Sequence, residues 1–194
     1  MLLVSMGVSI DGYINDRSGG IGWTVPSDEL FAFHLARVSQ LGGCLLGRRM
    51  YQTMQVWETD PTLIRTPLDA EFAEVWKALP KVVFSRSLDR VEGNARLATG
   101  TLSEEIESLR ASTDKDIEIS GAELAGPAIE AGLVDELGIF RYPIIVGGGT
   151  PLLPAVPTPI TLDLVESRVF SPNVIYERYR RANGSSAPSD GPSQ

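Results

Sequence analysis

Three short apolar runs in this chain each end in a turn of glycine, serine or arginine, and each is followed by a helical pattern. A strand followed by a helix, repeated along a chain, predicts a largely parallel sheet covered by helices. Backbone N–H groups at the start of a helix carry partial positive charge, so such turns bind phosphate groups readily. The three segments therefore predict a cradle for a phosphate-rich cofactor: Leu45-Leu46-Gly47-Arg48-Arg49-Met50, Val82-Val83-Phe84-Ser85-Arg86-Ser87 and Ile117-Glu118-Ile119-Ser120-Gly121-Ala122-Glu123.

The length and composition of the chain fit one globular domain. Its 194 residues are 43% hydrophobic and 22% charged, enough for one well-buried core but too few for two. We expect this domain to cover residues 1–182. Residues 183–194 contain only glycine, serine, proline, alanine and polar side chains, and they are expected to be disordered.

The charge of the chain argues against nucleic-acid and membrane-surface partners. A formal net charge of −8 is opposite to what binding a phosphate backbone requires, so an anionic ligand must be held locally. The chain has one cysteine, Cys44, and one histidine, which excludes an internal disulfide and disfavours a metal site. A reducing cytoplasm is the expected compartment, because the N-terminal segment lacks the basic region of a signal peptide.

The pattern of apolar residues and breakers predicts the order of the elements. A strand over residues 1–10 leads into a long glycine-rich loop, which we expect to act as a lid. Ser27 then caps a helix that Gly42-Gly43 should end. Further strands are expected over 44–46, 81–84, 94–98 and 117–119, with helices over 48–56, 66–79, 102–110 and 123–131, an extended segment over 134–146, and an antiparallel hairpin of 160–170 with 174–180.

Four motifs in this order resemble the dihydrofolate reductase-like superfamily, and in particular the C-terminal reductase domain of the bifunctional riboflavin-biosynthesis deaminase-reductase. The resemblance covers about residues 1–180. The motifs are Ser9-Ile10-Asp11-Gly12-Tyr13-Ile14, Leu46-Gly47-Arg48-Arg49-Met50-Tyr51, Val82-Val83-Phe84-Ser85-Arg86, and Leu133-Val134-Asp135-Glu136-Leu137 with Gly147-Gly148-Gly149-Thr150-Pro151.

The resemblance implies an α/β fold with an eight-stranded, mostly parallel sheet and a last antiparallel strand, binding NADPH across the strand ends. It assigns one cofactor segment to each of the three turns. The pyrophosphate and adenosine side would meet Gly47, Arg48, Arg49 and Met50, the ribose 2′-phosphate would meet Ser85, Arg86 and Ser87, and the pyrophosphate would lie over Gly121, Ala122, Glu123 and Leu124. Glycine allows a close backbone approach, and arginine binds phosphate oxygens with two parallel donors.

Asp28 is the candidate catalytic carboxylate. The segment Trp23-Thr24-Val25-Pro26-Ser27-Asp28 resembles the part of true dihydrofolate reductases that places an acid on the first helix, where the acid holds the pterin and helps deliver a proton. An aspartate after a serine at a helix start is also what capping alone selects. Both interpretations stay open here.

Other residues carry a functional and an ordinary interpretation side by side. His34 is expected in the core or at a pocket rim rather than as a proton donor. Tyr51 and Trp57 either line the pocket or pack in the core. Asp11 orients the lid, contacts substrate or simply makes a turn. The run Gly147-Gly148-Gly149 indicates close approach by a ligand or by backbone.

The predicted activity is hydride transfer from NADPH to a pyrimidine- or pterin-like heterocycle. The alternative is a protein that binds or senses NADPH without turnover, or one that is chiefly structural. A substrate with a ribose phosphate calls for a basic pocket, yet the only lysines are Lys77, Lys81 and Lys115, at positions that predict a helix end, a strand start and a loop. A homodimer through the C-terminal strands is expected.

Overall fold

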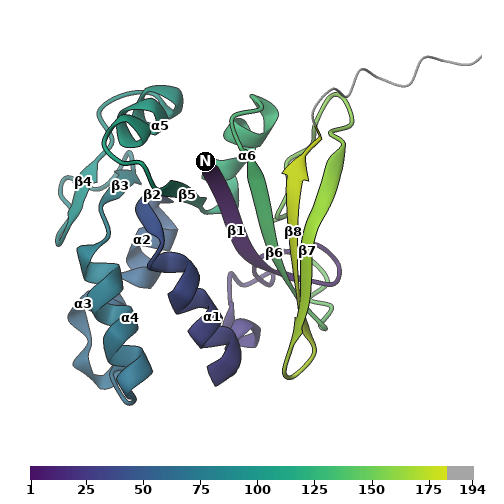
Figure 1. Cartoon of the computed structure of the whole chain (residues 1–194), viewed down its shortest axis with the longest axis horizontal. Coiled ribbons are helices and arrows are strands. Elements are labelled where there is room, and N and C mark those ends of the chain that lie inside the picture. The colour runs from purple at the N-terminus through teal and green to yellow at the C-terminus, as the bar shows by residue number, and fades with distance from the viewer. Residues whose placement is uncertain (183–194) are drawn as a thin grey trace, which may run out of the picture.

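The computed structural model describes residues 1–182, so the expected disordered tail lies outside the described residues. Its centre is an eight-stranded sheet in the order β4-β3-β2-β5-β1-β6-β8-β7 (Figure 1). All neighbours pair in parallel except β8, which runs antiparallel to β6 and β7. The strands are β1 Leu2–Ser9, β2 Leu41–Gly47, β3 Lys81–Phe84, β4 Ala95–Leu97, β5 Asp116–Ser120, β6 Glu136–Tyr142, β7 Leu162–Phe170 and β8 Val174–Arg181.

Helices cover both faces of this sheet. They are α1 Asp28–Val38, α2 Arg48–Met54, α3 Val56–Thr59, α4 Pro67–Ala78, α5 Leu102–Ala111 and α6 Ala122–Glu130, with short 3-10 turns at Gly22–Thr24 and Pro61–Leu63. The strands alternate between two cores: Leu45 packs with side chains of α5 and α6, whereas Leu46 packs with those of α1, α2 and α4. The α/β class, the parallel sheet and the antiparallel hairpin are therefore confirmed.

Two local expectations were wrong. Gly42 and Gly43 were expected to end the first helix, but they lie inside β2, and that helix ends at Val38. A Cβ on Gly43 would lie 2.8 Å from the Leu109 side chain of α5, and one on Gly42 would collide with Thr113. The glycines are thus required because α5 packs against the strand at this point.

The second of the three expected strand-to-helix turns, at Ser85–Ser87, is not followed by a helix. The hydroxyl of Ser85 accepts hydrogen bonds from the amides of Ser87 (3.1 Å) and Leu88 (3.0 Å), which folds the chain into a turn. Residues 85–94 then form an irregular connection to β4, which pairs directly with β3. The turn that contains Arg86 is therefore a loop and not a helix start.

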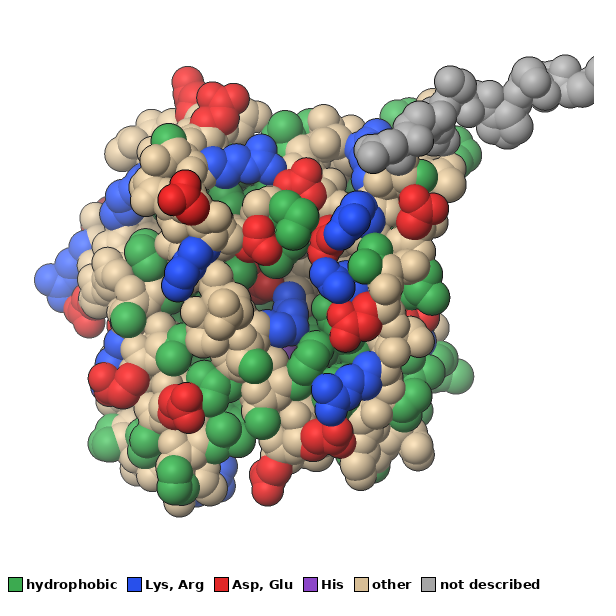
Figure 2. Space-filling model, viewed as in Figure 1, with side chains coloured by type: hydrophobic (Ala, Val, Ile, Leu, Met, Phe, Trp, Pro, Cys, Tyr) green, Lys and Arg blue, Asp and Glu red, His purple; other side chains and the backbone are tan. Residues whose placement is uncertain are grey.

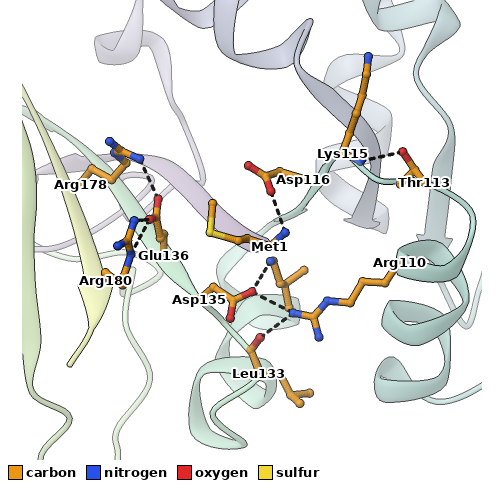
Figure 3. Close-up of polar contacts among 11 residues, drawn as sticks. Met1, Arg110, Thr113, Lys115, Asp116, Leu133, Asp135, Glu136, Arg178 and Arg180 are labelled. Atoms are coloured by element: carbon orange, nitrogen blue, oxygen red, sulfur yellow. Dashed lines mark hydrogen bonds and ion pairs between the residues drawn. The ribbon is translucent and has the colours of Figure 1, made fainter. Parts of the chain in front are cut away.

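The Asp135-Glu136 pair holds the sheet together at the edge where β1 begins (Figure 3). Asp135 accepts hydrogen bonds from the Leu2 amide (2.6 Å) and from Arg110 (3.0 Å), which connects β1 and α5. Glu136 is 3% exposed and accepts bonds from Arg178 (3.1 Å) and Arg180 (2.6 Å) on β8. Asp135 and Glu136 belong to the fourth motif. They lie where β1 and β6 begin, far from the ends of the parallel strands where a ligand is expected, so their role is structural.

Ion pairs also cover the outer part of the α1 face. Figure 2 shows basic and acidic side chains lying next to one another over β7 and β8. In this region of the fold, Arg168 of β7 lies 2.8 Å from Glu29 of α1, and Arg178 of β8 lies 3.2 Å from Glu166 of β7. Exposed pairs of this kind each contribute little to stability. The first pair joins the hairpin to α1, and the second joins the two strands of the hairpin.

Glu105 of α5 is a buried carboxylate whose loss we expect to destabilise the fold. Arg96 binds it, and the amides of Thr99 (2.7 Å) and Gly100 (3.1 Å) donate to it. The Arg96 bond, ahead of the two amide bonds, lowers the pKa of Glu105 to about 2 although burial opposes the shift. A carboxyl with a lowered folded-state pKa stabilises the protein above its unfolded pKa and loses this effect as the pH falls toward 2.

We predict that Glu105→Gln lowers the free energy of unfolding by about 2–3 kcal/mol at pH 7, the order expected when hydrogen bonds to a buried charge are lost. The difference from wild type should shrink as the pH is lowered below 4.5. Urea unfolding at several pH values measures this, with Glu107→Gln, an exposed residue of the same helix, as the control. An effect of Glu105→Gln that does not depend on pH would contradict the interpretation.

Candidate cofactor and substrate site

Three of the predicted site segments lie side by side at the carboxyl edge, which we define as the edge of the sheet where β1, β2, β3, β5 and β6 end. Gly47 of β2 is paired with Phe84 of β3, and Leu46 is paired with Ser120 of β5. The turns that follow these strands therefore begin next to one another. The structure brings together the three turns that the sequence analysis singled out.

The turns after β2 and β5 have open backbones. Gly121 has φ of +113°, a conformation that L side chains rarely adopt, and a Cβ there would lie 3.9 Å from the amide nitrogen of Gly47. A Cβ on Gly47 would meet nothing within 4 Å. The hydroxyls of Ser27, Thr66 and Thr101 cap α1, α4 and α5, but α2 and α6 start on glycine without a side-chain cap. Their first amides thus remain available to a bound anion.

Arginine side chains surround these turns and are accessible. Arg49 lies 3.3 Å from Glu123 across the two helix starts, and both side chains are about three-quarters exposed. Arg48 lies 3.4 Å from Gln52 one helical turn further along α2. Arg86 is exposed on the loop after β3. Cations at a helix start are unfavourable unless an anion offsets them, so the positions of Arg48 and Arg49 at the start of α2 favour a ligand.

Three of the residues assigned to the cofactor turn their side chains toward the core. Ala122 is 7% exposed and packs with Met6 and Val8 of β1. Met50 is partly buried against the same cluster, and Leu124 packs against the core under α5 and α6. At Met50, Ala122 and Leu124 it is therefore the backbone, and not the side chain, that is available to a bound cofactor. Ser87, by contrast, is exposed on the loop beside Arg86.

The expected lid, residues 10–26, is hydrogen-bonded to the segment after β6. The Ile14 amide donates to Thr150 (2.9 Å), and the Leu152 amide donates to Gly12 (3.0 Å). Asn15 accepts from the Thr150 amide at 2.7 Å. The loop and residues 143–152 thus form one unit over the ends of β1 and β6.

Asp11 and the glycine run are part of this unit. The Asp11 carboxylate accepts hydrogen bonds from the amides of Val146 (3.1 Å) and Gly147 (2.8 Å). Hydrogen bonding by Ser9, and then by these amides, keeps the pKa of Asp11 below its usual value. A Cβ on Gly149 would collide with the backbone of Asn15, so the missing side chain makes room for backbone. Asp11 therefore orients the loop, which was one of its two expected roles.

Trp23 is a residue of this loop that the sequence analysis did not select. Its ring meets Tyr142 of β6 edge-on at 5.6 Å, and the Tyr142 hydroxyl donates to the Thr24 carbonyl at 3.0 Å. The indole Nε1 is buried and has no hydrogen-bond partner within the described structure. A buried donor without an acceptor is unfavourable, so it points to an acceptor on a ligand or an ordered water. In the sequence, the one available sign of this role was a tryptophan within a glycine-rich loop.

The remaining surface of this unit is apolar and acidic. Large apolar side chains are exposed at Ile10 (50%), Val25 (75%) and Ile145 (72%). Asp28 is exposed in the first turn of α1, directly after Ser27, whose hydroxyl accepts from the Leu30 amide at 3.3 Å. Capping is thus done by Ser27, and the Asp28 carboxylate is accessible.

The three aromatic or imidazole residues with open interpretations belong to the core. Tyr51 is 5% exposed and its hydroxyl accepts from the Glu92 amide. Trp57 stacks on Phe31 at 5.6 Å. His34 is half-buried and its ring lies 4.4 Å from that of Phe140, at the margin of the core.

Two further classes of site were searched for in residues 1–182. None of the helices in this range combines the length and the apolar character needed to cross a membrane. The same range contains no group of three or more histidine, cysteine or acidic side chains that could hold a metal ion.

Comparison with known proteins identifies a family for the whole fold. Residues 1–176 match the family model described as the RibD C-terminal domain. The uncharacterised protein YyaP of Bacillus subtilis (strain 168) is 30% identical over 179 residues, which is 90% of this chain and 91% of YyaP.

Two solved structures share the fold. A protein from Shewanella sp. PV-4 assigned to riboflavin biosynthesis has a TM-score of 0.76 at 24% identity, over 93% of this chain and 98% of that one. Dihydrofolate reductase from Enterococcus faecalis, complexed with NADP(H) and RAB-propyl, has a TM-score of 0.56 at 18% identity, over 93% and 96% of the two chains.

We predict that His34 stays neutral well below its usual pKa. Burial, and then the nearby Arg37 guanidinium, lower the pKa of His34 to about 4, whereas an unfolded histidine titrates near 6.5. Between pH 6.5 and 4 the unfolded chain therefore binds a proton that the folded protein does not, so stability falls as the pH falls through this window.

An NMR titration of this single imidazole should give a pKa near 4. Unfolding of His34→Gln should lack the part of the pH dependence that lies between pH 6.5 and 4. A histidine titrating at 6.5 in the folded protein would contradict the prediction.

Proposed function

Because the chain belongs to the RibD C-terminal domain family, we propose that it is an NADPH-dependent reductase that transfers a hydride to a flat heterocycle of the pyrimidine or pterin kind. The observation that carries the proposal is the pair of adjacent helix starts at Gly47 and Gly121. Both lack a side-chain cap, and three arginines lie on the turns around them. These features fit a ligand with several phosphate groups.

The residues present fit NADPH in three ways. The amides after Gly121 would hold the pyrophosphate, because the positive φ and the absence of a Cβ leave the backbone open. Arg48 and Arg49 would neutralise its charge. Arg86, with Ser85 and Ser87 on the same turn, would meet the ribose 2′-phosphate that distinguishes NADPH from NADH. When bound, NADPH would supply the hydride.

The second half of the site would hold and orient the substrate. The loop of residues 10–26 and the segment 143–152 would exclude water from the reacting atoms. The buried Nε1 of Trp23 would donate to a substrate oxygen or an ordered water. Asp28 is the accessible carboxylate that would help deliver a proton, as expected from its resemblance to the acid of dihydrofolate reductases.

Calorimetric titration with NADPH and with NADH tests the cofactor proposal. Wild-type protein should bind NADPH more tightly, and Arg86→Ala should weaken NADPH binding about tenfold to a hundredfold, toward the NADH value, because a charged hydrogen bond is lost. NADH binding should stay unchanged in this variant. Arg90→Ala is the matched control, since Arg90 is an exposed arginine of the same loop.

Failure to bind either nucleotide would contradict the proposal. Equal weakening of both nucleotides by Arg86→Ala would contradict the role given to Arg86. Tight NADPH binding with no consumption by any heterocycle would favour the alternative of a protein that binds or senses NADPH without turnover.

We also propose that the protein forms a homodimer through the C-terminal hairpin, and that it acts in the cytoplasm, where its buried and unpaired Cys44 would stay reduced. The edge strand β7 exposes Leu164 (58%), Val165 (39%) and Val169 (66%). An exposed apolar edge strand is normally covered. Sedimentation should show a dimer that Val169→Glu weakens, and a monomeric wild type would contradict this.

A further inference from the structure

Positive and negative side chains gather at different parts of the carboxyl edge. The segments after β3, β2 and β5, residues 85–94, 47–50 and 121–124, have a small positive net charge. They contain four arginines and three acids, namely Arg48, Arg49, Arg86, Arg90, Asp89, Glu92 and Glu123. We call residues 10–29 and 143–152, which cover the ends of β1 and β6, the substrate half of the site. This half contains four acids and one arginine: Asp11, Asp16, Asp28, Glu29 and Arg17. The two halves thus carry opposite net charge.

The acids of the substrate half are held in place by the fold. Asp11 binds the amides of Val146 and Gly147. Asp16 accepts from the amides of Ser18 and Gly20, both at 2.8 Å. Hydrogen bonds keep the pKa of both carboxyls below the usual value, so both are charged at neutral pH.

The arginine within the substrate half, Arg17, is engaged with the loop, and Arg168 of β7 reaches this half from outside and pairs with Glu29 at 2.8 Å. The Nε of Arg17 donates to the Gly147 carbonyl at 2.8 Å. The three lysines of the chain lie elsewhere. Lys77 pairs with Glu74 on α4, Lys81 is buried against Glu58, and Lys115 lies in the turn before β5, at the opposite edge (Figure 3).

A phosphate group on the substrate would therefore meet an excess of acids, because Arg17 and Arg168 are already engaged with protein groups. What this half does offer is the buried indole donor of Trp23 and the exposed apolar side chains of Ile10, Val25 and Ile145. These groups suit the faces and the polar edge of an uncharged ring.

We infer that the substrate half selects a flat heterocycle that carries no phosphate, so that a phosphoribosyl pyrimidine is a poor substrate. The inference rests on the proposed function, because it concerns the second ligand of the same reductase site. The phosphates of the cofactor would be bound over β3, β2 and β5. A phosphate of the substrate would find no binding site over β1 and β6.

The test compares three substrates with the full-length protein and NADPH. They are 5-amino-6-ribosylaminouracil, its 5′-phosphate, and 6-methyl-7,8-dihydropterin, with NADPH oxidation followed by absorbance. We expect kcat/KM for at least one of the two phosphate-free compounds to exceed that for the phosphorylated one at least tenfold. The gap should narrow as salt is added, because salt screens the repulsion.

An equal or higher kcat/KM for the phosphorylated pyrimidine would overturn the inference and leave the reductase proposal standing. Binding of NADPH in calorimetry without oxidation by any of the three compounds would overturn both. The two proposals therefore fail in distinguishable ways.

Two charge-reversal variants test whether the acids of the substrate half cause the selectivity against phosphate. Glu29→Lys, in the first turn of α1, should improve kcat/KM for the phosphorylated pyrimidine at least threefold relative to the phosphate-free one. Glu130→Lys is the control, because it makes the same change in net charge at the exposed last residue of α6. Equal changes in the two variants would overturn the assignment to the substrate half.

Discussion

The parallel pairing of β2 with β5 is the constraint on which the site depends. Because Leu46 is paired with Ser120, Gly47 and Gly121 come next to one another and two helices begin side by side. Neither helix start has a side-chain cap, and Gly121 keeps a backbone conformation with φ of +113° that L side chains rarely adopt. The fold thus gives up local stabilisation at both helix starts, as expected of a place kept open for an anion.

The neighbouring strands β1 and β6 end in a unit of a different kind. Asp11 and Asn15 bind the backbone of the segment after β6, so these hydrogen bonds hold the loop of residues 10–26 to that segment. A basic cofactor half and an acidic substrate half then lie along one sheet edge. Under the proposed function, this separation would let a chain of net charge −8 hold a phosphate-rich cofactor locally and select a different class of molecule beside it.

Local sequence signals were sufficient for most of the fold and for the place of the site. The alternation of strands and helices predicted the parallel sheet, and Thr66-Pro67 and Gly132 marked a helix start and a helix end that the structure contains. The errors arose where contacts with distant segments determine the local conformation. Gly42-Gly43 resembles a helix stop, but the pair serves the packing of α5, and the turn after Ser85 could not show that β4 follows without a helix. The orphan Nε1 of Trp23 also depends on where β6 lies.

The most direct test of the account is a crystal structure of the protein with NADPH. The account predicts that the pyrophosphate oxygens lie within hydrogen-bond distance of the amides at the start of α6, and that the guanidinium of Arg86 contacts the 2′-phosphate. The nicotinamide should then face Trp23 of the loop and Asp28 at the start of α1. A cofactor bound elsewhere, for instance in the cavity of about 330 Å³ beside Asn94 and Arg96 at the opposite edge, would contradict the central claim.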